Sequence, residues 1–127
     1  MRRTLAMLLA LSGLTGAHAS PAEPALITAA ALRFVPGDDA LPLGPLIVEQ
    51  GRRLLFVNAD NLGVHSIYSV EYDEDGWPLF WTDQQNLGSA AEVEGVPDLL
   101  PRAYAFFCSN HPEMKGTLVV TDDDQGA

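Results

Sequence analysis

Cysteine is almost absent from this chain of 127 residues, since Cys108 is the only one. A single cysteine cannot form a disulfide within its own chain, so an intrachain disulfide framework is excluded. Basic residues are also scarce, with 7 Lys and Arg against 17 Asp and Glu. The resulting net negative charge repels nucleic acid and anionic membranes. This charge either attracts a basic protein partner or simply keeps the protein in solution.

Long hydrophobic runs are missing too. The longest apolar stretch, from Leu5 to about Leu14, is shorter than the roughly 20 residues that a membrane-spanning helix needs. It follows two arginines and ends at Ala17-His18-Ala19, which is the pattern of a secretory signal peptide. We therefore expect residues 1–19 to be removed and the protein to be periplasmic or otherwise exported.

Residues 20–127 are enough for one domain with one core. Without the leader, the 17 acidic residues face 5 basic ones, a net charge of −12. No transmembrane run, repeat or long low-complexity segment remains in this part of the sequence. We expect a single domain that is monomeric.

Short apolar runs separated by Gly and Pro predict strands rather than long helices. The expected strands are Leu46–Glu49, Leu54–Asn58, Ser66–Tyr72, Ala103–Cys108 and Thr117–Thr121. Residues 29–32 have helical propensity over a marginal length, and residues 73–100 suggest a long loop with one short helix. This pattern predicts an all-β sandwich of two sheets around one core.

Residues that bind soft metals are few, and most of them lie together. Outside the leader, the only His, Cys and Met residues are His65, Cys108, His111 and Met114. Three of them form the motif C-x2-H-x2-M, and random placement of such scarce residues seldom produces this spacing. Two imidazoles, one thiolate and a weak axial thioether are the ligands of blue-copper electron-transfer sites.

Other interpretations of these residues remain. A lone Cys at a strand end is more often a small buried hydrophobic residue than a ligand, and a lone Met usually belongs to the core. A structural zinc site is the competing metal hypothesis. Zinc sites of that kind use several Cys or His in paired clusters, however, whereas this chain has one Cys.

Two segments resemble the cupredoxin family, in the group that contains plastocyanin, pseudoazurin and amicyanin. They are LIVEQGRRLLFVNADNLGVHS (46–66) and YAFFCSNHPEMKGTLVV (104–120), with weaker support from FVP (34–36). The resemblance implies a Greek-key β-sandwich that holds one type 1 copper ion near one end. The ligands by position are His65, Cys108, His111 and Met114.

The resemblance also implies two supporting contacts. The backbone amide of Ser66 would donate a hydrogen bond to the thiolate, and Asn58 would tie neighbouring loops together. The chain departs from the family pattern at Arg102, where a Gly is common. The segments GDDALPLG (37–44) and EYDEDGWPLFWTDQ (71–84) have no counterpart that we can align.

The ligand set predicts an electron carrier rather than an enzyme. Three ligands and a weak fourth leave no open position for a substrate, and no further histidines are present for extra copper centres. A non-redox copper-handling protein is the alternative, and a sandwich without metal is a weaker one. The acidic run at 71–75 either docks a basic redox partner or is a solvated loop, while Trp77, Phe80 and Trp81 suggest a hydrophobic cap.

Overall fold

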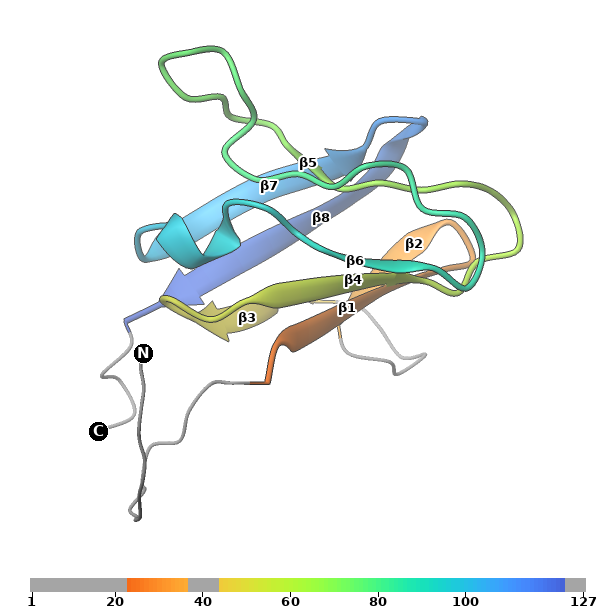
Figure 1. The fold of residues 1–127 in the computed structure, drawn as a ribbon, viewed down its shortest axis with the longest axis horizontal. Helices are drawn as coiled ribbons and strands as arrows, with labels where there is room; N and C mark the ends of the chain where they lie inside the picture. Colours follow the sequence, from red (N-terminus) through yellow and green to blue (C-terminus); the bar gives the residue numbers. More distant parts are fainter. Residues whose placement is uncertain (1–22, 37–43, 123–127) are drawn as a thin grey trace, which may run out of the picture.

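Two four-stranded sheets that face each other form the framework of the molecule (Figure 1). The computed structural model describes residues 23–36 and 44–122. The expected signal peptide and nearly all of the GDDALPLG segment lie outside these residues. The strand order is β2-β1-β4-β6 in one sheet and β3-β8-β7-β5 in the other. The prediction of an all-β sandwich is therefore confirmed.

The first sheet consists of β1 (Ala25–Ala30), β2 (Arg33–Pro36), β4 (Leu54–Asn58) and β6 (Ala90–Glu92). The second consists of β3 (Leu46–Glu49), β5 (Tyr68–Ser69), β7 (Arg102–Cys108) and β8 (His111–Thr121). Each sheet contains one parallel pair, β1 with β4 and β3 with β8, and its other pairs are antiparallel. A short 3-10 helix, Val96–Asp98, precedes β7.

Most of the predicted strands are present. β3 and β4 have the expected bounds, and β7 begins one residue earlier than expected. β8 is longer than the prediction, since it begins at His111 rather than Thr117. The short helix expected within residues 73–100 is the 3-10 helix, but strand β6 in the same region was not expected.

The helical interpretation of residues 29–32 is wrong. β1 and β2 form a hairpin joined by Ala31 and Leu32, both of which have positive φ angles, 52° and 59°. Local propensity is overruled here because β1 also pairs in parallel with β4 along its length. Positive φ at both turn residues matches the right-handed twist of the two strands.

The predicted strand Ser66–Tyr72 is only partly correct. Continuous strand pairing is limited to Tyr68 and Ser69, which face β7. Beyond them the chain forms a hairpin in which Tyr72 bridges to Pro78. Proline has no N–H to donate, so the ladder is interrupted there. This hairpin projects from the sandwich, drawn in green between β5 and β6 in Figure 1.

Arg102 attaches the projecting hairpin to the sheet. Its guanidinium donates two hydrogen bonds to the Glu71 carboxylate, at 2.9 and 2.7 Å, and lies 4.0 Å from the centre of the Tyr104 ring. The hydrogen bonds from Arg102 lower the pKa of Glu71 below its usual value. The residue that departs from the family pattern thus has a structural role of its own.

The core lies between the inner faces of the two sheets. As alternation predicts, Tyr104, Phe106 and Cys108 are all buried. Phe106 packs edge-on against Phe34, with ring centres 5.0 Å apart, and also against Phe80. Phe80 caps the core as expected. No helix within the described residues is long and apolar enough to cross a membrane.

The cap prediction is wrong for Trp77. Its side chain is 64% exposed, because it sits in the projecting hairpin rather than over the core. Trp81 is half-buried.

Candidate metal centre

The β7–β8 hairpin brings Cys108 and His111 together. Cys108 is the last residue of β7 and His111 the first of β8, and the two are paired across a turn of only Ser109 and Asn110. The pairing register shifts next to Cys108, so that Phe107 lies opposite Lys115. The two-residue spacing of the motif is therefore the length of a tight hairpin turn.

His65 comes from a separate part of the chain, the segment between β4 and β5. Its backbone exchanges two hydrogen bonds with Gln85, at 3.1 and 2.8 Å. Its side chain is fully buried. Strand-like pairing thus holds His65 in place beside Cys108, from which it is separated by 43 positions in the chain.

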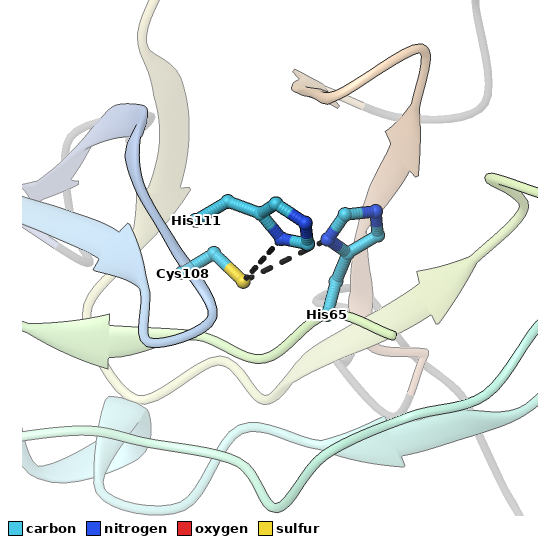
Figure 2. Close-up of side chains that lie close together, drawn as sticks. All are labelled: His65, Cys108 and His111. Atoms are coloured by element: carbon cyan, nitrogen blue, oxygen red, sulfur yellow. Dashed lines mark hydrogen bonds between the residues drawn. The ribbon is translucent and has the colours of Figure 1, made fainter. Parts of the chain in front are cut away.

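The three side chains converge on one point (Figure 2). The Cys108 Sγ lies 3.7 Å from the His65 Nδ1 and 3.7 Å from the His111 Nδ1. The three ligand atoms all lie within 4.8 Å of one another. Bonds of about 2.0 Å to nitrogen and 2.3 Å to sulfur place a nitrogen and a sulfur ligand of one metal ion about 3.5–3.7 Å apart. The residues present therefore fit a single bound metal ion, and their types fit a type 1 copper site.

The Cys108 sulfur accepts a hydrogen bond inside the protein. The backbone N–H of Ser66 donates to Sγ at 3.4 Å, as the resemblance implied. Cys108 itself is fully buried. This contact holds the sulfur against the segment that carries His65.

Polar side chains join the two loops that carry the ligands. Ser66 and Ser109 are hydrogen bonded through their hydroxyls at 2.9 Å, and Gln84 donates to the same Ser109 hydroxyl at 2.9 Å. Asn110 donates to the Val64 carbonyl at 3.0 Å. Sequence reasoning missed these contacts, because their partners are 25 to 46 residues apart.

Asn58 ties three backbone groups together, in agreement with the role that the resemblance implied. Its buried side chain donates to the carbonyls of Gly63 and Gln85, at 3.0 and 2.8 Å, and accepts from the N–H of Asp60 at 2.8 Å. These groups belong to the loop before His65 and to the segment paired with it. The loop is therefore fixed relative to β4.

Asp60 is the site residue that the sequence did not reveal. Its carboxylate lies 2.8 Å from the His65 Nε2 and accepts backbone N–H bonds from Leu32 and Leu62, at 2.7 and 2.9 Å. Burial would raise the pKa of Asp60, but these three hydrogen bonds hold it below its usual value. Only a weak signal for this contact is present in the sequence. Asp60 lies shortly after a strand and five residues before a histidine.

Met114 is buried, three residues after His111 on β8. Its role as the axial ligand remains a prediction. Among the described residues, His65, Cys108 and His111 form the only cluster of three His, Cys, Asp or Glu side chains with the spacing of a metal site.

His111 is the most accessible of the three clustered residues. It is half-buried, whereas His65 and Cys108 are fully enclosed. Gly63 lies so close to the His111 ring that a Cβ there would come within 3.1 Å of Cε1. Pro112, the residue after His111, is exposed.

Comparison with known proteins identifies the fold. No family model and no curated protein matches the chain. Solved structures of amicyanin do match. A reduced tryptophan-to-tyrosine variant of amicyanin has a TM-score of 0.58 and 18% identity, with 76% of this chain and 81% of the amicyanin chain covered. The Cu(I) form of a methionine-to-alanine variant has a TM-score of 0.57 and 17% identity over the same shares. The chain has the cupredoxin fold.

Proposed function

We propose that this protein is a type 1 copper protein that carries single electrons between redox partners. The observation that carries this proposal is the position of the Cys108 sulfur, 3.7 Å from one nitrogen of each histidine and hydrogen bonded to a backbone amide. When bound, copper would supply a reversible one-electron couple between Cu(I) and Cu(II). The Cu(I) form of amicyanin among the similar structures supports this choice of metal.

The donor set explains why copper is preferred here. Thiolate and thioether ligands suit Cu(I), whereas imidazole suits several metals, so a set of His65, Cys108, His111 and Met114 serves both oxidation states of copper. Loops joined by hydrogen bonds hold the two imidazoles and the thiolate in one arrangement. A site that changes little in shape on reduction favours rapid electron transfer over catalysis.

His111 provides the route by which electrons enter and leave. It is the only one of the clustered residues that is not fully buried, and the next residue, Pro112, is exposed. A small accessible area of this kind would suit a short-lived contact with a partner. The projecting hairpin carries the acidic run at 71–75. Its negative charge would steer a basic partner toward the protein.

Export is part of this proposal. Residues 1–19 carry the pattern of a signal peptide, and a carrier of this type would work outside the cytoplasm once they are removed. Amino-terminal sequencing of protein recovered from the producing cells would test this. A mature chain that starts at Ser20 is expected, and a chain that still starts at Met1 would contradict it.

Copper loading of the purified protein tests the function directly. The loaded protein should show intense blue absorption, the narrow copper hyperfine splitting of a type 1 site in paramagnetic resonance, and fast reversible reduction. Cys108→Ser should lose the blue colour, since a hydroxyl does not ionise readily or provide a sulfur ligand. Copper binding without colour or reversible reduction would instead indicate a copper-handling protein.

A further inference from the structure

A carboxylate lies directly behind one of the proposed ligands. Asp60 is 2% exposed and His65 is fully buried, and they are joined at 2.8 Å through the Asp60 Oδ2 and the His65 Nε2. An ionised carboxylate can only accept hydrogen bonds, so Nε2 must carry the hydrogen. The other ring nitrogen, Nδ1, then presents its lone pair on the side that faces the Cys108 sulfur.

The other contacts of Asp60 hold its carboxylate in place. Oδ2 also accepts the N–H of Leu32 at 2.7 Å, and Oδ1 accepts the N–H of Leu62 at 2.9 Å. The backbone N–H of Asp60 in turn donates to Asn58 at 2.8 Å. The carboxylate is thus oriented from the turn after β1 and from the loop after β4, and its contacts place it against the imidazole.

We propose that Asp60 is a positioning residue for the copper site and that its charge lowers the reduction potential of that site. This inference rests on the proposed function. The hydrogen bond fixes the tautomer and the plane of the His65 ring, as outer carboxylates do for metal-bound histidines. Reduction adds one electron, taken from the donor protein, and no bond of the chain is made or broken.

The direction of the effect follows from charge. A buried negative charge beside the ligand stabilises Cu(II) more than Cu(I), because the more highly charged ion interacts more strongly with it at low dielectric. Asp60 therefore favours the oxidised protein. Since Asp60 acts through the imidazole and does not reach the ion itself, it tunes the couple rather than holding the metal.

Asp60 also supports the β1–β2 turn, and the two roles can be separated. The carboxylate of Asp60 accepts a hydrogen bond from the backbone N–H of Leu32. Leu32 has a φ of 59°, a conformation that glycine adopts more readily. Leu32→Gly keeps the N–H and the carboxylate while it relieves the turn. This variant should leave the reduction potential unchanged, and it controls for effects that reach the site through the turn alone.

The main experiment compares Asp60→Asn with Asp98→Asn in the copper-loaded protein. Both changes remove one negative charge, but Asp98 lies exposed on the 3-10 helix. The amide in Asp60→Asn retains an oxygen that can accept from His65, so the blue absorption should persist. We expect the preference for Cu(I) over Cu(II) to rise about tenfold in Asp60→Asn, an upward shift of about 59 mV for a one-electron couple. The reduction potential of Asp98→Asn should shift by only a small fraction of that amount.

An unchanged potential in a blue Asp60→Asn protein would overturn the proposal. If that variant does not fold, the wild-type protein still provides a test. Nitrogen-15 NMR of the metal-free protein should show a slowly exchanging Nε2–H on His65, and an Nδ1–H tautomer would overturn the proposal as well. Failure of the protein to bind copper would contradict the proposed function and with it the effect on the potential. The positioning of His65 by Asp60 would still be tested, since the NMR measurement does not depend on the metal.

Discussion

At the scale of single residues, the Cys108 thiol illustrates how environment determines chemistry. A buried cysteine in apolar surroundings is inert, but here a backbone N–H and two imidazoles face the sulfur. The same residue contributes its backbone to β7 and closes the core at one end of the sandwich. Cys108 is therefore both a core residue and a proposed metal ligand, so metal binding would be coupled to the packing around this side chain.

Met114→Gln tests the weakest proposed ligand. The variant should still bind copper through His65, Cys108 and His111, but its reduction potential should fall, since an oxygen ligand favours Cu(II) more than a thioether does. Equilibrium redox titration of the loaded variant measures this. Met114→Leu is the matched control, because it removes the ligand atom while keeping an apolar side chain in the core, and its potential should rise. Equal potentials in all three proteins would show that Met114 is a core residue only.

Asn58→Ala tests the residue that fixes the loop before His65. The change removes three hydrogen bonds of a fully buried side chain and leaves buried backbone groups without partners. We expect the free energy of unfolding to fall by about 3 kcal/mol. Chemical denaturation of the metal-free protein measures it. Asn61→Ala, at an exposed position three residues on, serves as the control and should change stability little. A loss below about 0.5 kcal/mol in Asn58→Ala would contradict the assigned role.

At the scale of elements, turns and loop contacts decide the shape of the site. The β7–β8 hairpin places two ligands opposite each other, and the segment that contains Gln85 holds the third by strand-like pairing. Gly95, at the start of the 3-10 helix, allows the chain to pass close to the projecting hairpin. It has a φ of 92°, and a Cβ there would overlap the backbone carbonyl of Leu79.

Gly95→Ala and Gly51→Ala separate the cost of backbone strain from that of a clash. Both glycines have similar positive φ angles, 92° and 88°, but nothing lies within 4 Å of a Cβ at Gly51. Gly51→Ala should cost about 1–2 kcal/mol, the penalty of a left-handed conformation for a residue with a side chain. Gly95→Ala should lower the free energy of unfolding by at least twice that amount, because the Leu79 backbone cannot move aside freely. Denaturant unfolding of both variants measures the difference, and equal losses would contradict the predicted clash.

At the scale of the whole molecule, charge and accessible surface define how a partner approaches. The chain is strongly acidic, and no Lys or Arg occurs between Arg53 and Arg102. Within that stretch lie the acidic residues of the projecting hairpin and the exposed side chains of Tyr72 and Trp77. One of these acidic residues, Glu71, is paired with Arg102. Under the proposed function, a basic partner would be attracted to this acidic stretch.

Salt dependence tests this electrostatic role. Oxidation of the reduced protein by a cationic cobalt(III) complex should slow as salt is added, since ions screen the attraction over about 10 Å at 0.1 M. Oxidation by the anionic ferricyanide should accelerate instead. Replacing Glu74 and Asp75 by Gln and Asn should make both oxidation rates depend less on salt. Asp98→Asn should change the salt dependence less. Rates that do not respond to salt with either oxidant would contradict steering by the hairpin.

Much of the fold could be predicted because its signals are local. β3 and β4 are short apolar runs separated by a turn at Gly51, and the alternation of Tyr104, Phe106 and Cys108 indicated which face is buried. Two errors arose where distant pairing decides the structure. Ala29 and Ala30 are strand residues because β1 pairs with β4, so only Ala31 and Leu32 form the turn. The predicted strand after Ser66 is shortened where Pro78 lies opposite Tyr72.

The sequence by itself determined the chemistry that is available, because four scarce residues at set spacing limit which metal can bind. It also determined the hairpin that joins Cys108 to His111, since a two-residue turn depends on neighbouring residues only. Only the tertiary structure decided that His65 and Asp60 meet this hairpin and that Trp77 faces solvent. Contacts of that kind depend on how two sheets pack, and residues that lie far apart in the chain carry no local signal of their pairing.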